Sequence, residues 1–342
     1  MTKHEIIIGN SNNMKVVPDG SVNLIVTSPP YPMVEMWDEM FSLQNPSIRN
    51  DLESGNGIVA FDKMHDNLNS IWQECDRVLA DNGFICVNIG DATRTIGGNF
   101  QLYSNHTKII NKFSSMGYCV LPDIHWRKQS NAPNKFMGSG MYPAGAYVTY
   151  EHEYILVFRK GGKRIFKGVE RERRQKSAFF WEERNIWFSD LWEIKGTSQI
   201  ITAPKASRDR SAAFPFEIPY RLINMYSAEG DTILDPFAGL GTTILAAIAS
   251  NRNSFGFEID EKIANLALEN IKELSSGLNR VIDKRIEAHK TFIDNLSEEQ
   301  KAKCYDNVPQ GYKVKTRQET AIRIDHISNI RSEGFKIICQ YR

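Results

Sequence analysis

Residues 232–243 read TILDPFAGLGTT, and this stretch decides the fold class. An apolar run enters a glycine-containing turn, and a helix rich in small residues (242–250) follows it. Gly239 and Gly241 allow the backbone to turn tightly and to approach a ligand closely. The helix behind them begins with backbone N–H groups that have no partner within the helix. A strand, a glycine turn and a helix in this order predict a nucleotide-type site in an α/β sheet.

Acidic residues around this turn narrow the choice of ligand. Glu258 lies near the end of the next apolar run (254–260), 19 residues after Gly239, where a carboxylate can accept bonds from ribose hydroxyls. Asp235 stands just before the turn and would repel a pyrophosphate. A cofactor with a ribose, a positive charge and no phosphates fits better, and S-adenosyl-L-methionine has these features. The alternative is a turn that only packs a helix on a strand.

Apolar runs that predict strands alternate with amphipathic helices along the chain, which indicates an α/β fold. Further strands are predicted over 5–8, 22–26, 84–90, 120–128 and 151–162. Helices are predicted over 62–80, 101–116, 218–226, 261–274 and 281–296, whereas residues 161–205 look irregular. Together these runs predict a seven-stranded mixed sheet, mostly parallel, with helices on both faces.

The bulk composition excludes several classes of protein. The 342 residues are 41% hydrophobic and carry a formal charge of +1, so any nucleic-acid contact depends on a local basic patch. No apolar run is long enough to span a membrane, and the N-terminus does not resemble a signal peptide. Five scattered cysteines without a CxxC predict neither a disulfide framework nor a zinc site. We expect a cytoplasmic protein without a metal.

Residues 27–31 read TSPPY and follow another predicted strand. The Ser28 hydroxyl and a carbonyl of Pro29 or Pro30 could accept bonds from both protons of an amino group, and the prolines stiffen the loop. Tyr31 could stack on an aromatic ring. A base inside a duplex reaches such a site only after it is flipped out. The alternative is that Tyr31 is a packed aromatic residue that caps the sheet.

TSPPY and DPFAGLGTT together resemble the catalytic and cofactor motifs of amino-directed DNA methyltransferases from bacterial restriction–modification systems. The catalytic motif comes first here, which resembles the circularly permuted β group. The resemblance covers roughly residues 5–275. It implies a Rossmann-like methyltransferase fold that depends on S-adenosyl-L-methionine, is circularly permuted and carries an inserted target-recognition module. It also implies duplex DNA as the partner, in the cytoplasm of a bacterial or archaeal cell.

The resemblance further implies which residues bind the cofactor. FPFEIPYRLI (214–223) resembles the segment that packs on its methionine end, and Asn10 replaces the acid of the family's adenine-contacting turn. The expected cofactor-binding residues are Asn10, Phe214, Pro215, Asp235, Phe237, Gly239, Gly241, Thr242 and Glu258. The expected catalytic residues are Ser28, Pro29, Pro30 and Tyr31.

Ser28 is the first residue of the four-residue motif Ser-Pro-Pro-Tyr, and the residue type at this position is related to which base is methylated. In the family, Ser-Pro-Pro-Tyr usually accompanies cytosine-N4 methylation and Asp-Pro-Pro-Tyr accompanies adenine-N6 methylation. We therefore predict a cytosine-N4 enzyme that protects host DNA from a cognate restriction enzyme. Adenine-N6 methylation, methylation of a protein or RNA amide, and DNA binding without catalysis remain alternatives. Carbon-5 methylation is disfavoured because it needs a cysteine nucleophile, which in those enzymes follows a proline, and no cysteine does so here.

A basic segment lies between the two motifs. Residues 159–176 contain nine basic and two acidic side chains, which is typical of a phosphate-binding patch but also of a solvated charged face. The expected DNA-binding residues are Lys160, Lys163, Arg164, Lys167, Arg171, Arg173 and Arg174. The predicted division has a catalytic half (1–160), a target-recognition region (161–206), a cofactor-binding half (207–275) and a C-terminal extension (276–342). No obligate protein partner is evident, and a homodimer is left open.

Overall fold

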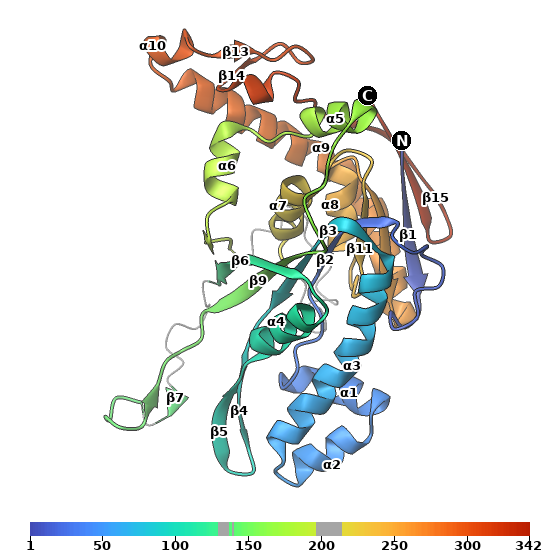
Figure 1. Cartoon of the computed structure of the whole chain (residues 1–342), viewed down its shortest axis with the longest axis vertical. Coiled ribbons are helices and arrows are strands. Elements are labelled where there is room, and N and C mark those ends of the chain that lie inside the picture. Colours follow the sequence, from blue (N-terminus) through green and yellow to red (C-terminus); the bar gives the residue numbers. More distant parts are fainter. Residues whose placement is uncertain (129–136, 139, 196–213) are drawn as a thin grey trace.

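The computed structural model describes residues 1–128, 137–138, 140–195 and 214–342, and its central feature is a mixed sheet (Figure 1). Within these residues ten strands pair in the order β10-β6-β9-β3-β2-β11-β12-β1-β16-β15. Their bounds are β1 (Thr2–Ile8), β2 (Val22–Thr27), β3 (Leu79–Ile89), β6 (Cys119–Arg127), β9 (His152–Arg159), β10 (Leu191–Trp192), β11 (Thr232–Asp235), β12 (Asn253–Glu258), β15 (Ile327–Glu333) and β16 (Lys336–Tyr341).

The sheet is parallel at its centre and mixed at its sides. Strands β3, β2, β11, β12 and β1 are parallel to one another, whereas β9 lies antiparallel between β6 and β3. Strand β16 pairs antiparallel with β1. The mixed α/β class is confirmed, but the predicted number of seven strands is wrong among the described residues. The additional strands β10, β15 and β16 lie at the two sides of the sheet, where short or half-exposed strands lack a continuous apolar pattern.

Two apolar cores cover the two faces of the sheet. Helices α3 (Gly57–Val78) and α4 (Asn105–Ser115) contribute to one core, and α7 (Glu217–Tyr226), α8 (Thr242–Ala249) and α9 (Glu261–Asp294) contribute to the other. Strand β2 contributes residues to both cores, because Leu24 and Val26 pack on one face of the sheet and Ile25 packs on the other. Burial of both faces explains why the central strands read as uninterrupted apolar runs.

Helix α9 is a single helix of 34 residues where the sequence predicted two shorter ones. The Asp260 side chain caps its first turn by accepting bonds from the backbone N–H groups of Lys262 and Ile263. Buried Ile271, Leu278 and Ile282 continue one apolar stripe along it. The predicted boundary at residues 275/276 therefore lies inside this helix, and the chain beyond it returns to the main sheet through β15 and β16.

Smaller elements surround the sheet. The segment after TSPPY forms η1 (Glu35–Trp37), α1 (Asp38–Gln44) and α2 (Ser47–Glu53), and a hairpin of β4 (Ala92–Ile96) and β5 (Asn99–Tyr103) precedes α4. The remaining short elements are β7 (Met137–Gly138), β8 (Ala146–Tyr147), α5 (Gly168–Lys176), α6 (Trp181–Trp187), α10 (Glu298–Lys301), β13 (Tyr305–Asp306), β14 (Lys313–Val314) and η3 (Arg317–Glu319). Residues 161–205, expected to be irregular, thus contain two helices and a short strand within their described part.

We call the end of the sheet where β2, β3, β6, β11, β12 and β1 finish the carboxyl edge, and the end where they begin the amino edge. In open α/β sheets, ligands bind at the carboxyl edge. None of the described helices is both long enough and apolar enough to cross a membrane.

Candidate active site

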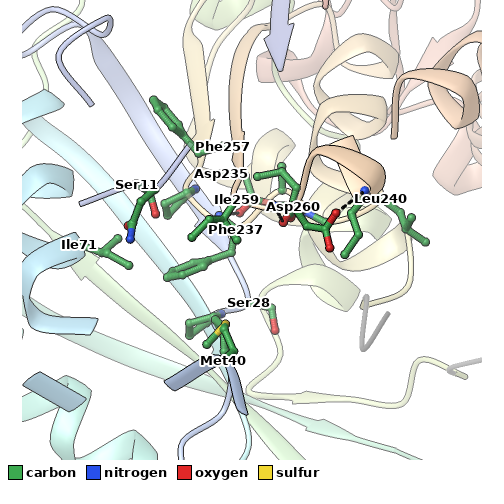
Figure 2. Close-up of a pocket in the computed structure, with 18 of the residues that line it drawn as sticks. Ser11, Ser28, Met40, Ile71, Asp235, Phe237, Leu240, Phe257, Ile259 and Asp260 are labelled. Atoms are coloured by element: carbon green, nitrogen blue, oxygen red, sulfur yellow. Dashed lines mark hydrogen bonds between the residues drawn. The ribbon is translucent and has the colours of Figure 1, made fainter. Parts of the chain in front are cut away.

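A cavity of about 440 Å³ opens at the carboxyl edge and is lined by both predicted motifs (Figure 2). Ser28, Pro29, Pro30 and Tyr31, which follow β2, all line it. Seven of the nine predicted cofactor-binding residues also line it: Asn10, Phe214, Asp235, Phe237, Gly239, Thr242 and Glu258. The fold therefore brings together two motifs that lie more than 200 residues apart, because β2 and β11 are adjacent strands.

Asp235 connects the two motifs. One carboxylate oxygen accepts bonds from the Thr27 hydroxyl at 2.7 Å and the Phe237 backbone N–H at 3.0 Å, and the other accepts from the Thr243 hydroxyl at 2.6 Å. Burial raises the pKa of Asp235 to about 6, and these hydrogen bonds oppose the shift. Asp235 thus joins the ends of β2 and β11 to the start of α8. The sequence indicated its position but not this connecting role.

Glu258 holds the glycine turn from the end of β12. Its carboxylate accepts a bond from the Gly239 backbone N–H at 3.0 Å and another from the Asp260 backbone N–H at 3.0 Å. Burial raises the pKa of this carboxyl group. Each oxygen has a second lone pair, so the group can still accept bonds from a ligand in the cavity. This geometry fits a pair of ribose hydroxyls.

The two glycines of the turn have different surroundings. Gly239 has φ +49° and lines the cavity, as expected for a close approach to a ligand. Gly241 has φ +80°, and a Cβ there would lie 3.1 Å from Ile271 of α9. Among the described residues, Gly241 and Pro215 are not part of the cavity lining. Gly241 therefore serves the packing of α8 on α9 rather than direct contact with a ligand.

Several residues that line the cavity were not predicted. Trp37, Met40 and Phe41 come from η1 and α1, and Leu68 and Ile71 come from α3. They make a large part of the cavity lining apolar. Met40 and Ile71 are labelled in Figure 2 among the residues that line the cavity. The apolar spacing of the helix over 62–80 was visible in the sequence, but nothing in it distinguished residues that face the core from residues that face a cavity.

Tyr31 is fixed by a hydrogen-bond network that extends from the TSPPY loop to β3 and β9. Its Oη lies 2.8 Å from Glu153 Oε2, 2.8 Å from Asn88 Nδ2 and 3.1 Å from Ser28 Oγ. Asn88 also donates to Glu153 Oε2 at 2.6 Å. Burial and the nearby Glu153 carboxylate raise the pKa of the Tyr31 hydroxyl well above its usual value, so the hydroxyl keeps its proton.

Glycine at position 90 makes room for this arrangement. A Cβ at Gly90 would lie 3.1 Å from the Tyr31 ring and 3.3 Å from Glu153. Asn88, Gly90 and Glu153 were not predicted from the sequence. The sequence did contain a signal for two of them, because Asn88 and Glu153 are polar residues within apolar runs that predict strands. A polar group that is buried in such a strand needs a hydrogen-bond partner.

The basic segment lies at the amino edge, away from the cavity. Lys160 Nζ donates to the backbone carbonyl of Asp76 at 2.6 Å, and Arg164 Nη1 donates to Asp231 at 2.7 Å, just before β3 and β11 begin. The Ser177 hydroxyl, after α5, accepts a bond from the Glu229 N–H at 2.7 Å. Strand β2 alone has six residues, about 20 Å at ~3.3 Å per residue, and separates this edge from Ser28.

The basic segment lies at the opposite end of the sheet from Ser28, and its role in binding DNA stays a prediction. Lys160 and Arg164 are engaged in ion pairs with acidic side chains of the chain itself. The other five predicted residues, Lys163, Lys167, Arg171, Arg173 and Arg174, are exposed, so they form a charged surface remote from Tyr31. Trp187 and Trp192 are buried, whereas Trp181 is 42% exposed and stacks on Phe292.

Among the described residues, no group of three or more His, Cys, Asp or Glu side chains is arranged to hold a metal ion. The cavity instead offers backbone groups, carboxylates and apolar walls.

Comparison with known proteins decides the family. The N6_N4_Mtase family model, described as DNA methylase, matches residues 22–269. This chain belongs to that DNA methylase family. The match includes both motifs that line the cavity. It confirms the predicted class of enzyme, a DNA methyltransferase that uses S-adenosyl-L-methionine. The N6/N4 family includes enzymes for both amino targets, so membership does not assign the base.

Relatives and solved structures agree with this assignment. The methylase is 51% identical to the type II methyltransferase M.MthZI of Methanothermobacter thermautotrophicus, with 94% of this chain and 90% of that protein aligned. It is 49% identical to the type II methyltransferase M.MjaI of Methanocaldococcus jannaschii, over 79% and 91%. A DNA modification methylase of Thermus thermophilus, solved in complex with S-adenosyl-L-methionine, is 28% identical, with a TM-score of 0.60 and coverage of 79% and 96%.

The structure of the PvuII DNA methyltransferase, described as cytosine-N4-specific, matches with a TM-score of 0.58 and 17% identity over 82% of this chain and 93% of that one. At this identity the match supports the fold of the methylase.

Proposed function

We propose that this methylase transfers a methyl group from S-adenosyl-L-methionine to the exocyclic N4 amine of a cytosine in duplex DNA. The observation that carries the proposal is the shared cavity, in which Ser28 of Ser-Pro-Pro-Tyr and the glycine turn of the cofactor motif face one space. The type II methyltransferases M.MthZI and M.MjaI support a role in a restriction–modification system, with methylation protecting host DNA from a cognate nuclease.

The cofactor would lie along the glycine turn. Glu258 would accept bonds from the ribose hydroxyls, and Asn10 and Phe214 would contact the adenine and methionine ends. The apolar wall from α1 and α3 would exclude water from the methyl group. A base that stays paired inside a duplex cannot enter this cavity, so the target would be flipped out and stacked on Tyr31. We also propose that the order of the two motifs reflects the circular permutation of the β group.

The transfer itself needs no covalent enzyme intermediate. The lone pair of the exocyclic nitrogen attacks the methyl carbon, the carbon–sulfur bond breaks, and its electron pair returns to sulfur. The products are S-adenosyl-L-homocysteine and a methylated amine, which then loses one proton to solvent. Ser28 Oγ and a carbonyl of Pro29 or Pro30 would accept bonds from the amino protons. These bonds orient the nitrogen lone pair toward the methyl group.

The serine at the first position of the motif favours cytosine over adenine. Adenine-N6 methylation remains the second candidate, because the matched family includes both targets. The test is to incubate the enzyme with S-adenosyl-L-methionine and duplex DNA, digest the DNA to nucleosides and identify the products by mass spectrometry. We expect N4-methylcytosine. N6-methyladenine without N4-methylcytosine would replace the cytosine assignment, and no methylated nucleoside would contradict the proposed function.

A further inference from the structure

Glu153, near the start of β9, is a buried carboxylate that no part of the proposed reaction uses directly. The residue is 7% exposed, and it is not among the described residues that line the cavity. One oxygen accepts bonds from Tyr31 Oη at 2.8 Å and Asn88 Nδ2 at 2.6 Å. The other oxygen forms an ion pair with Lys128. Such a buried charge is costly unless its partners compensate it, so its presence calls for an explanation.

The network has only one consistent direction of hydrogen bonds. An ionised carboxylate accepts bonds but cannot donate, so the single hydrogen of the Tyr31 hydroxyl must point to Glu153. Asn88 Nδ2 is also a donor, and it approaches Tyr31 Oη at 2.8 Å. At the 3.1 Å contact between Tyr31 Oη and Ser28 Oγ, the tyrosine therefore has no hydrogen left to give. Ser28 must be the donor there.

This direction determines what Ser28 offers to the cavity. A serine hydroxyl has one hydrogen and two lone pairs. Because Ser28 donates its one hydrogen to Tyr31 Oη, its Oγ can only accept hydrogen bonds on the side that faces the cavity. An exocyclic amine presents two N–H donors, so an acceptor is the group that it requires. A serine hydrogen pointing into the cavity would instead face another donor.

We propose that Glu153 is a positioning residue that acts through the Tyr31 hydroxyl to keep Ser28 an acceptor for the target amine. The inference rests on the proposed function and applies to cytosine and adenine alike, since both carry an exocyclic amine. Glu153 itself touches neither substrate nor cofactor. It therefore contributes to turnover only as long as Tyr31 and Ser28 transmit its effect.

The test is a double-mutant cycle with Glu153→Gln, Ser28→Ala and the combined variant, measured as single-turnover methylation of duplex DNA. Glutamine preserves the shape but can donate through its amide, so the direction is no longer imposed. We expect Glu153→Gln to slow transfer by about 10- to 100-fold in the Ser28 background. In the Ser28→Ala background the same change should alter the rate by less than about twofold, because no hydroxyl remains to be oriented.

Three controls separate positioning from folding. Glu333→Gln is the matched variant, since Glu333 is an exposed glutamate of another strand, β15, outside the network, and it should leave the rate unchanged. Affinity for S-adenosyl-L-methionine should be preserved in Glu153→Gln. If Glu153→Gln fails to fold, Tyr31→Phe keeps the ring, removes the hydroxyl and should show the same dependence on Ser28.

The outcomes distinguish the inference from the proposed function. Equal slowing by Glu153→Gln with and without the Ser28 hydroxyl would show an ordinary structural role and overturn the inference alone. An unchanged rate in Glu153→Gln would overturn it as well. A wild-type enzyme that methylates no amine in duplex DNA would overturn the proposed function, and the inference with it.

Discussion

The two edges of the sheet use charge in opposite ways. At the carboxyl edge, Asp235 and Glu153 are buried and accept hydrogen bonds from residues of β2, the TSPPY loop and α8. At the amino edge, Arg171, Arg173 and Arg174 of α5 are exposed to solvent. The exposed cluster was the more conspicuous feature of the sequence, yet the buried groups surround the cavity. Local charge density in the sequence therefore does not coincide with the cavity, which the two motifs line.

The largest expected effect is on the rate of methyl transfer, and it compares serines at the two ends of β2. Ser28→Ala at the carboxyl end of β2 should reduce the rate of methyl transfer by on the order of 10²–10³, because one acceptor for the target amine is lost. Affinity for S-adenosyl-L-methionine, measured by calorimetry, should change by less than about twofold. The matched control is Ser21→Ala at the amino end, where the hydroxyl bonds to the Pro18 carbonyl. Similar rates for the two variants would remove the proposed role of Ser28.

A second prediction concerns the buried charge at the carboxyl edge. The pKa of Asp235 is about 6 in the folded protein and about 3.9 in an unfolded chain, so the folded state binds the proton more tightly. Relative to Asp235→Asn, the wild type should lose stability as the pH rises from about 4 to about 6. The loss should reach about 3 kcal/mol and stay constant above about pH 6.

The measurement is urea unfolding of both proteins at several pH values without cofactor. A wild-type advantage in unfolding free energy that increases with pH over this range would show that the carboxylate is stabilised rather than penalised by its site.

A third prediction addresses the cofactor end of the cavity. Glu258→Ala should raise the Kd for S-adenosyl-L-methionine by about 10- to 100-fold, because hydrogen bonds to a charged acceptor are lost. Glu261→Ala, three residues later and exposed on α9, is the control and should bind normally. Calorimetric titration measures both. Unchanged affinity in Glu258→Ala would place the ribose elsewhere in the cavity.

The smallest expected effect is on the affinity for duplex DNA, and it compares arginine residues at the carboxyl edge and the amino edge. Arg127 ends β6 at the carboxyl edge and is 55% exposed, with acidic partners no closer than 3.6 Å among the described residues. Arg127→Ala should weaken binding of duplex DNA by about threefold to tenfold at low salt, as expected for one phosphate contact. The triple alanine variant of Arg171, Arg173 and Arg174 should change it by less than about twofold. The reverse ranking would show that the basic segment is the DNA-binding surface, as the sequence predicted.

Much of the fold was predictable because its central strands are buried on both faces. Apolar runs of β2, β3, β9 and β12 stand out from the amphipathic helices between them, and their predicted positions agree with the structure to within a few residues. The sides of the sheet were not predictable in the same way. Strand β16 alternates buried and exposed positions over only six residues, and β15 has a single buried residue at its start. Such patterns are also found in loops and helix ends.

The sequence by itself determined the class of the site. TSPPY and DPFAGLGTT are local motifs in which residue type and backbone freedom act over a few positions, and the acid that ends the next strand completes the cofactor motif. Only the tertiary structure decided how these parts work together. It placed Asp235 between the two motifs, Glu153 behind Tyr31 and the basic helix at the far edge. These relations depend on strand order, because strands that are distant in the chain become neighbours through backbone pairing that leaves no trace in either segment alone.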